Sequence, residues 1–373
     1  MRRTLLISND FPPRAGGIQS YVHELAGHLP AADLVVYAPA WTGAAEFDAA
    51  QAYPVHRHPT SLMVPTPDVV RMARSLIDQY RLTAVWYGAA APLALLTPAL
   101  RRHGIVRTVA STHGHEVGWS MLPGSRQLLR RIGRTNDVIT FVSRYSRTRI
   151  ASALGPDAAL EYLPPGVDAA AFRPDPAQRA ALRERWGIGD RPVVVAVSRL
   201  VRRKGQDVLV QAWPQVLAGR PDAVLLIVGG GSEQARLESL VDRHALRDNV
   251  IVTGPVPHAE LAGYYAAGDV FAMPVRTRGR GLDVEGLGIV FLEASAAGLP
   301  VIVGDSGGAP ETVRPGITGL VVDGRDTAAV AAACRDLLAD RLRARRLGAA
   351  GKRWVSERWT WAASGERLVQ LLA

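Results

Sequence analysis

Two glutamates, Glu285 and Glu293, are separated by seven residues that include Gly286 and Gly288. The apolar residues from Ile289 onward predict a helix, which places the first carboxylate in a loop and the second about one turn inside that helix. Free N–H groups at a helix start can bind phosphate, and a carboxylate can accept hydrogen bonds from two vicinal hydroxyls. The spacing therefore favours a site that holds a phosphate and a sugar together. The alternative, a capping carboxylate beside an ordinary helix-face glutamate, fits less well because Glu293 lies among apolar residues.

A basic segment that carries Arg199 and Lys204 follows the predicted strand 193–197. It lies where a strand passes into a helix, and guanidinium and ammonium charges at such an edge suit a pyrophosphate. Lys204 stands out because the chain has 44 lysines and arginines, of which Lys352 is the one other lysine. A solvated basic loop is the alternative interpretation.

Two loops of the first half have the same placement between a strand and a helix. Gly16 and Gly17 lie between the predicted strand 4–8 and the predicted helix 18–29, where glycine lets a diphosphate approach the backbone closely. His113 and His115 follow the predicted strand 107–111 together with Glu116. No well-separated third metal partner accompanies the histidines, so we expect these side chains to position a substrate. A plain glycine turn and a hydrogen-bonded structural loop are the respective alternatives.

A glycine run, Gly229 to Gly231, also follows a predicted strand, 224–228. A dinucleotide-binding fingerprint would need a further glycine near position 234, where this chain has Gln234. A tight turn is the simpler interpretation, and an NAD-dependent oxidoreductase remains a weakly supported alternative.

Short apolar runs alternate with helical patterns along the whole chain, which predicts repeated βαβ units and parallel sheets. A stiff connector from Pro164 to Asp168 interrupts the series. We therefore expect two doubly wound α/β domains joined near residue 165, with a helical tail beyond residue 339 whose tryptophans need a surface to cover them. The further strands that we expect are 34–38, 84–87, 138–142 and 160–163 in the first domain and 250–253, 270–273 and 300–303 in the second.

Composition sets the class of protein and of partner. A chain of 373 residues with 48% hydrophobic residues can bury two domain cores. The single cysteine, Cys334, excludes an intrachain disulfide and fits a reducing cytoplasm, and we expect neither a signal peptide nor a transmembrane helix. The net charge of +10 points to an anionic partner, which could be nucleic acid, nucleotide phosphates or an acidic membrane surface.

Seven arginines fall between residues 126 and 149, against one acid, Asp137. Leu128, Leu129 and Ile132 are interleaved with them at helical spacing, and such a basic amphipathic helix can lie on an anionic membrane. An ordinary solvated helix with a buried apolar stripe is the alternative. A nucleic-acid-binding protein is disfavoured because no aromatic residue is interleaved with the cations of this helix. The membrane contacts that we expect come from Arg126, Arg130, Arg131 and Arg134.

Taken together, Gly16-Gly17, His113, the Arg199 and Lys204 pair and the two spaced glutamates resemble the retaining glycosyltransferases of family 4. Their fold, called GT-B, has two Rossmann-like domains, and the resemblance runs in order along nearly the whole chain. The longer strings at residues 9–14, 111–123 and 277–288 resemble those actinobacterial members that transfer mannose from GDP-mannose to phosphatidylinositol monomannoside. The other enzyme interpretation is a family 4 enzyme that uses a different nucleotide sugar or a soluble acceptor.

The resemblance implies a GT-B fold with an N-terminal acceptor domain over residues 1–167, a donor domain over 168–354, and a C-terminal helix, about 355–373, that packs back across the first domain. It also implies GDP-mannose as donor, phosphatidylinositol monomannoside as acceptor, and peripheral association with the inner face of the plasma membrane. No metal or other cofactor is expected, because the chain has no Asp-x-Asp triplet.

The same resemblance implies roles for individual residues. The catalytic residues would be His113, Arg199, Lys204 and Glu285; the donor would contact Gly16, Gly17, Arg199, Lys204, Val256, Glu285, Gly286, Leu287, Gly288, Ile289 and Glu293; the acceptor would contact Asn9, Asp10, Gln19 and His115.

Overall fold

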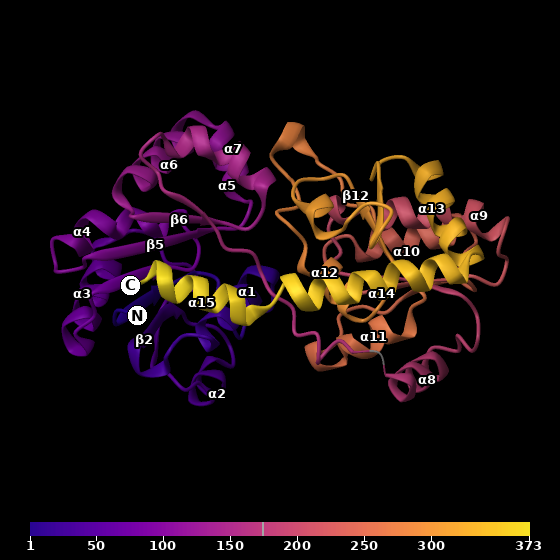
Figure 1. Cartoon of the computed structure of the whole chain (residues 1–373), viewed down its shortest axis with the longest axis horizontal. Helices are drawn as coiled ribbons and strands as arrows, with labels where there is room; N and C mark the ends of the chain where they lie inside the picture. Colours follow the sequence, from indigo (N-terminus) through magenta and orange to yellow (C-terminus); the bar gives the residue numbers. More distant parts are fainter. Residues whose placement is uncertain (174) are drawn as a thin grey trace. The chain divides into compact units, whose positions relative to one another are not determined.

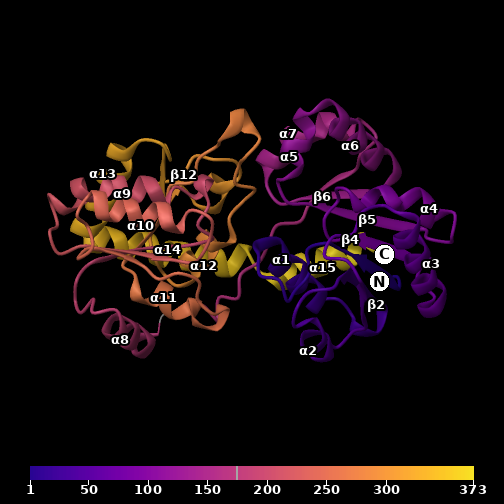
Figure 2. The ribbon, with the colours of Figure 1, turned by 180° about the vertical axis from the view of Figure 1, so that it is seen from behind.

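The structure, a computed structural model, describes residues 1–173 and 175–373. It divides the chain into two compact units, one formed by Met1–Gly166 with Trp361–Ala373 and the other by Val167–Thr360 (Figures 1 and 2). The expected fold class, two Rossmann-like α/β domains with a C-terminal helix on the first, is confirmed. The first unit ends one residue earlier than expected, and the returning segment begins at Trp361 rather than near 355, because helix α14 continues to Arg358.

The first unit is built on a seven-stranded parallel sheet with strand order β3-β2-β1-β4-β5-β6-β7. Its central strands are short apolar runs that are buried on both faces, as parallel sheets covered by helices require. Its elements are β1 (Thr4–Ile7), α1 (Gly17–Gly27), η1 (Ala31–Asp33), β2 (Leu34–Pro39), α2 (Ala44–Ala49), β3 (Val55–His58), α3 (Pro67–Tyr80), β4 (Ala84–Tyr87), η2 (Leu93–Leu96), α4 (Thr97–Arg101), β5 (Arg107–Thr112), α5 (Glu116–Met121), α6 (Pro123–Thr135), β6 (Val138–Phe141), α7 (Arg144–Leu154), β7 (Leu160–Tyr162) and α15 (Trp361–Leu371).

The second unit has a six-stranded parallel sheet with strand order β10-β9-β8-β11-β12-β13. Alternate residues of β8 face opposite sides of this sheet, so Val194 and Ala196 belong to one apolar core and Val193, Val195 and Val197 to the other. Its elements are α8 (Pro176–Arg185), β8 (Val193–Val197), η3 (Arg202–Lys204), α9 (Gln206–Leu217), β9 (Val224–Val228), α10 (Gln234–Arg243), β10 (Val250–Val252), η4 (His258–Glu260), α11 (Leu261–Ala267), β11 (Val270–Met273), η5 (Gly279–Gly281), α12 (Ile289–Ala296), β12 (Val301–Gly304), η6 (Ala309–Thr312), β13 (Gly319–Val322), α13 (Thr327–Ala339) and α14 (Arg341–Arg358).

The C-terminal helix α15 packs on α1 of the first unit, where Figure 1 shows the two chain ends side by side. The rings of Tyr21 and Trp361 meet edge to face at 6.0 Å. A Cβ at Gly365 would lie 2.5 Å from Cβ of His28, so glycine permits this close helix approach. The Arg2 N–H donates to the Leu372 carbonyl, which ties the returning helix to the strand that begins the fold.

The expected strands were found with ends that are unchanged or shifted by one residue, but the sequence analysis missed β3 and β13. None of the helices in the described parts of the chain is both long and apolar enough to cross a membrane.

Candidate active site

A buried ion pair joins Lys204 to Glu285 at the carboxyl edge of the second sheet. Lys204 Nζ lies 2.9 Å from Oε2 of Glu285, and each side chain is 9% exposed. Lys204 ends η3 after strand β8, and Glu285 lies in the loop between β11 and α12. Since β8 and β11 are parallel neighbours, their carboxyl ends bring these two residues together. The structure therefore joins two residues that the sequence placed 81 positions apart.

The electrostatic balance of this pair keeps Glu285 ionised. Burial alone would raise the pKa of Glu285, but the charges of Lys204 and Arg203 outweigh it and hold the pKa below its ordinary value. Arg203 Nε lies 3.4 Å from the same carboxylate oxygen. Burial lowers the pKa of Lys204 from its ordinary value, and the charge of Glu285 acts in the opposite direction. Glu285 is therefore a carboxylate at neutral pH and can accept hydrogen bonds from hydroxyl groups.

Glu293 lies one turn inside α12 and has a different environment from Glu285. The hydroxyl of Tyr265, a buried residue of α11, donates to Oε2 of Glu293 at 2.6 Å. Burial raises the pKa of Glu293, and the hydrogen bond from Tyr265 only partly offsets this. The sequence analysis did not identify Tyr265, because nothing in the local sequence indicates that α11 and α12 share a contact.

The segment between the two glutamates has a backbone shape that depends on glycine. Gly288 begins α12 at φ +94°, and a Cβ at this position would lie 2.6 Å from the ring of Phe291. As at any helix start, the first backbone N–H groups, here those of Ile289 and Val290, have no acceptor within the helix, whereas the Phe291 N–H donates to the Gly288 carbonyl. Gly286 and the buried Leu287 precede them. The helix start therefore offers N–H donors between the two carboxylates, as the sequence predicted.

Backbone contacts that the sequence analysis missed hold Glu285 in place. The Glu285 N–H donates to Oγ of Ser306, and the Gly308 N–H donates to the Glu285 carbonyl. A Cβ at Gly307 would lie 1.8 Å from that carbonyl oxygen, so a glycine is required where the β12 loop crosses the β11 loop. The Gly-Gly pair after β12 was the available signal.

The four cations of the basic segment differ in how far the protein already neutralises them. Arg202 is paired with Glu233 at 3.0 Å, and Arg203 lies near Glu285. Arg199 is exposed and makes no ion pair with a described residue, although its charge acts on Lys204. By this measure Arg199 is the cation of this edge that is free for a diphosphate, whereas Lys204 is paired with Glu285. Val256 lies half-buried in the loop that follows β10 of the same sheet.

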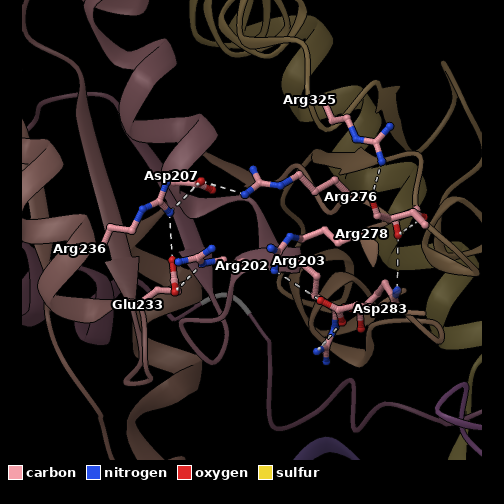
Figure 3. A network of polar contacts seen from close by, with 12 residues as sticks. Arg202, Arg203, Asp207, Glu233, Arg236, Arg276, Arg278, Asp283 and Arg325 are labelled. Atoms are coloured by element: carbon pink, nitrogen blue, oxygen red, sulfur yellow. Dashed lines mark hydrogen bonds and ion pairs between the residues drawn. The ribbon is translucent and has the colours of Figure 1, made fainter. Parts of the chain in front are cut away.

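A network of ion pairs, seen in Figure 3, links the loops that carry these residues. Asp207 at the start of α9 accepts hydrogen bonds from Arg276 at 2.8 Å and Arg236 at 3.1 Å, and Arg236 also pairs with Glu233 at 2.9 Å. The Arg276 N–H donates to the carbonyl of Arg203. The network therefore fixes the β8, β9 and β11 loops relative to one another within the second unit.

In the first unit, Gly16 and Gly17 lie at the start of α1. Gly17 is exposed, and a Cβ built on it would have no atom within 4 Å. The Arg57 guanidinium positions the loop before it by donating to the Pro12 carbonyl at 2.7 Å and to Asp48 at 2.6 Å. An anion can therefore reach the N–H groups of this helix start from open space.

The residues expected to bind the acceptor have distinct partners. Gln19 donates to Oδ1 of Asp10 at 2.8 Å, which brings these two residues together. Asn9 uses both groups of its amide on the backbone of Met63, at 2.9 and 2.7 Å. The observed contacts of Asn9 therefore hold the 60–65 loop against the end of β1.

His113 follows β5 and is held by backbone contacts. Its Nε2 lies 2.6 Å from the carbonyl of Gly88, and since a carbonyl can only accept, this nitrogen carries the proton. Glu116 accepts the N–H groups of His113 and Gly114, and its other oxygen lies 3.2 Å from His115 Nε2. Burial is the main cause of the lowered pKa of His113. Its imidazole is therefore neutral at neutral pH.

The four arginines expected at a membrane surface, Arg126, Arg130, Arg131 and Arg134, are all exposed on α6. The apolar residues of this helix divide, since Leu129 and Ile132 are fully buried against the domain and Leu128 is 39% exposed. Met121 and Leu122, which precede the helix, are also exposed. The interleaved leucine and isoleucine thus mainly cover the core, and the exposed apolar residues lie around the first turns.

No group of three or more histidine, cysteine, aspartate or glutamate residues that could hold a metal ion occurs within residues 1–173 and 175–373.

Comparisons with known proteins cover nearly the whole chain. Residues 15–171 match the family model described as Glycosyltransferase Family 4, and residues 178–354 match the model described as Glycosyl transferases group 1. Proteins of Mycolicibacterium smegmatis and Mycobacterium tuberculosis are each 57% identical, over 99–100% of this chain and 98% of their own length. Both are named GDP-mannose-dependent alpha-(1-6)-phosphatidylinositol monomannoside mannosyltransferase.

A Corynebacterium glutamicum protein, 48% identical over 100% of this chain and 98% of its own, has a name that specifies the monoacylated acceptor. Among solved structures, HepE of Anabaena in complex with UDP superposes with a TM-score of 0.84 at 20% identity, covering 99% of each chain. Sucrose-phosphate synthase from Thermosynechococcus elongatus superposes with a TM-score of 0.83 at 25% identity, covering 99% of this chain and 98% of its own.

Proposed function

Because the chain belongs to the glycosyltransferases that carry the family 4 and group 1 domains, we propose that it transfers mannose from GDP-mannose to phosphatidylinositol monomannoside. The observation that carries this proposal is the 57% identity to two such mannosyltransferases over nearly the full length of every chain compared. The expected resemblance to family 4 is thereby confirmed. The roles of the individual site residues, given below, are part of this proposal.

Neutralisation of the donor diphosphate is the main task of the second unit in this proposal. When the bond between C1 of mannose and the β-phosphate oxygen breaks, negative charge develops on GDP and positive character on C1. Lys204 and Arg199 lie where they can neutralise the diphosphate, and the N–H groups at the start of α12 add their dipoles. The N–H groups of α12 are held in place by the fold before the reaction, so their contribution needs no reorganisation. We propose that this protein needs no metal ion, and retained activity in the presence of EDTA would support that.

The two glutamates bind sugar hydroxyls at opposite ends of the donor. Glu293, aligned by Tyr265, is suited to the ribose hydroxyls, and Glu285 to the hydroxyls of mannose. Gly286, Leu287, Gly288 and Ile289 supply the backbone that passes between them. In the first unit, Gly17 would approach the diphosphate and the neutral His113 would lie beside the transferred sugar.

The chemical step is a substitution at C1. An acceptor hydroxyl oxygen forms the new bond to C1, the bond from C1 to the phosphate oxygen breaks, and the hydroxyl proton passes to the departing phosphate. We infer that attack occurs on the face from which GDP leaves, which retains the α configuration. A glycosyl-enzyme adduct trapped and located by mass spectrometry would contradict this mechanism.

The acceptor is a lipid, so we also propose that α6 lies on an anionic membrane surface. Its exposed arginines and the exposed Met121, Leu122 and Leu128 are the contacts. Asp10 and Gln19, which hydrogen-bond to each other, and His115, which lies beside Glu116, are the polar groups proposed for the acceptor head group.

The experiment that tests the function measures transfer of labelled mannose to phosphatidylinositol monomannoside in mixed micelles. UDP-glucose and lipid-free reactions are the controls for donor and acceptor, and Glu285→Gln is compared with Arg243→Ala, an exposed arginine of α10. Transfer that needs both GDP-mannose and the lipid, and that falls with Glu285→Gln alone, supports the proposal. Transfer to a soluble acceptor, or from another nucleotide sugar, would replace the assignment with a different family 4 activity.

A further inference from the structure

A short loop between β11 and Glu285 contains three consecutive residues in the left-handed region. Gly279, Arg280 and Gly281 have φ values of +56°, +55° and +102°. Glycine adopts this conformation freely, whereas an arginine does so at a cost in free energy. The chain therefore has a side chain at Arg280 where a third glycine would be less strained.

The loop is held rigidly at its base, next to the candidate active site. The Arg278 N–H donates to the Asp283 carbonyl at 2.8 Å, and the Asp283 N–H donates back to the Arg278 carbonyl at 3.2 Å. The Asp283 carboxylate lies 3.8 Å from Arg278 and 3.5 Å from Arg203. Figure 3 shows these side chains together. Arg203 is also the arginine near Glu285. The conformation of the loop is thus coupled to the carboxylate proposed to orient the sugar.

The cations of this loop are unequally neutralised. Arg276 is paired with Asp207, and Arg278 with Asp283. Arg280 is exposed and makes no ion pair with any residue that the structure describes. Its near neighbour Leu282 is also exposed, by 48%. The tip of the loop therefore presents one free guanidinium beside one free apolar side chain.

We propose that this tip, formed by Arg280 and Leu282, is a subsite for the acceptor glycolipid, in which Arg280 pairs with the phosphodiester. Guanidinium binds phosphate oxygens through two parallel hydrogen bonds. The donor diphosphate already has Arg199 and Lys204 at the edge of the sheet, whereas the acceptor phosphodiester has no assigned cation. Leu282 suits the boundary between head group and acyl chain, where an apolar residue beside a cation is favourable. The inference rests on the proposed function and extends it to the lipid phosphate.

The first test compares Arg280→Ala, Arg280→Gly and Arg280→Lys with the control Arg243→Ala. We expect the Ala and Gly variants to raise the acceptor KM about 10- to 100-fold, as the loss of a hydrogen bond to a charged group implies. The Lys variant should lie between them and wild type, and the GDP-mannose KM should not change. Because Arg280→Gly relieves the backbone, its Tm should equal or exceed that of wild type, which separates loss of binding from loss of folding.

A second test separates the acceptor phosphate from anionic lipid in general. An acyl-free acceptor that keeps the phosphodiester is compared with one that lacks it, and vesicles of neutral lipid are compared with vesicles containing anionic phospholipid. We expect Arg280→Ala to raise the KM for the acyl-free acceptor that keeps the phosphodiester, and to leave the KM unchanged for the acceptor that lacks it. If Arg280→Ala slowed transfer only on vesicles that contain anionic phospholipid, Arg280 would bind the membrane surface, and the proposed acceptor subsite would be overturned.

The two proposals fail in different ways. If wild-type protein transfers mannose but the Arg280 variants keep the wild-type acceptor KM, the loop inference alone is overturned. If wild-type protein transfers no mannose to the lipid, the proposed function fails and the loop inference fails with it.

Discussion

Replacing Lys204 by methionine should destabilise the second unit as well as abolish transfer. The change removes the ammonium 2.9 Å from Glu285 and leaves a carboxylate that is 9% exposed. Removing one member of a buried ion pair costs about 3–5 kcal/mol. Arg203, 3.4 Å away and 25% exposed, retains part of the compensation, so we expect a loss of about 2–4 kcal/mol. For a unit of this size, that lowers Tm by roughly 4–16 °C.

The measurement is thermal unfolding followed by circular dichroism or calorimetry, with Glu285→Gln and the double variant completing the cycle. Because the double variant leaves neither charge buried, it should recover most of the stability lost in Lys204→Met. It should not recover mannosyl transfer, because the cation proposed for the diphosphate is still missing. Equal Tm values for wild type and Lys204→Met, or no recovery in the double variant, would refute the reasoning from the buried pair.

Three further predictions follow from single contacts. The pKa of Glu293 is raised in the folded protein, so its contribution to the free energy of unfolding is fully present below pH 4.5 and is lost as pH rises through the folded-state pKa. The difference in free energy of unfolding between wild type and Glu293→Gln should therefore narrow as pH rises through that range. Unfolding curves recorded at a series of pH values measure this difference, and a difference that does not change with pH contradicts the prediction. Arg57→Ala should lower the free energy of unfolding by about 1–3 kcal/mol and raise the GDP-mannose KM, because the loop before Gly17 loses the hydrogen bond from Arg57 to the Pro12 carbonyl. Arg71→Ala, which removes an exposed ion pair with Asp68, is the control for both unfolding and kinetics. Binding to anionic vesicles in sedimentation should fall steeply with added salt and weaken further in Arg130→Ala/Arg131→Ala; salt-insensitive binding would argue against the electrostatic surface on α6.

The sequence predicted the strands that are buried along their whole length, and both strands that it missed, β3 and β13, are partly buried edge strands. The strands β1 and β8 are wholly buried and read as unbroken aliphatic runs. In contrast, β3 lies at a sheet edge with the sequence Val-His-Arg-His and half-buried side chains, so it has no apolar pattern. Strand β13 is also at an edge and begins at Gly319, where a glycine indicates a turn as readily as a strand.

The site could be predicted from the rule that ligands bind at the carboxyl ends of parallel strands, and only for residues to which that rule applies. His113 directly follows β5, and Lys204 and Glu285 lie in the segments that join β8 to α9 and β11 to α12, so their placement at a carboxyl edge could be predicted from the sequence. Tyr265 could not be found in this way, because it lies within a helix and meets Glu293 only through the packing of α11 near α12. Ser306 and Gly307 follow β12, so the same rule places them at the carboxyl edge, but their contact with Glu285 depends on the order of strands β11 and β12, which the sequence does not give.

The opposite environments of the two glutamates suggest how donor binding and sugar orientation are coupled. Glu285 lies among cations, so its carboxylate is formed at neutral pH and pairs with Lys204. In the proposed function, a diphosphate that binds Lys204 would compete for the same ammonium and would let Glu285 accept hydrogen bonds from the sugar instead. Glu293 differs because its main polar partner is the hydroxyl of Tyr265, which fixes one oxygen, while the charges of His258 and Lys204 have smaller effects on its pKa. Under this proposal the carboxylate of Glu293 is aligned before the donor binds, whereas that of Glu285 would become free only when the phosphate arrives.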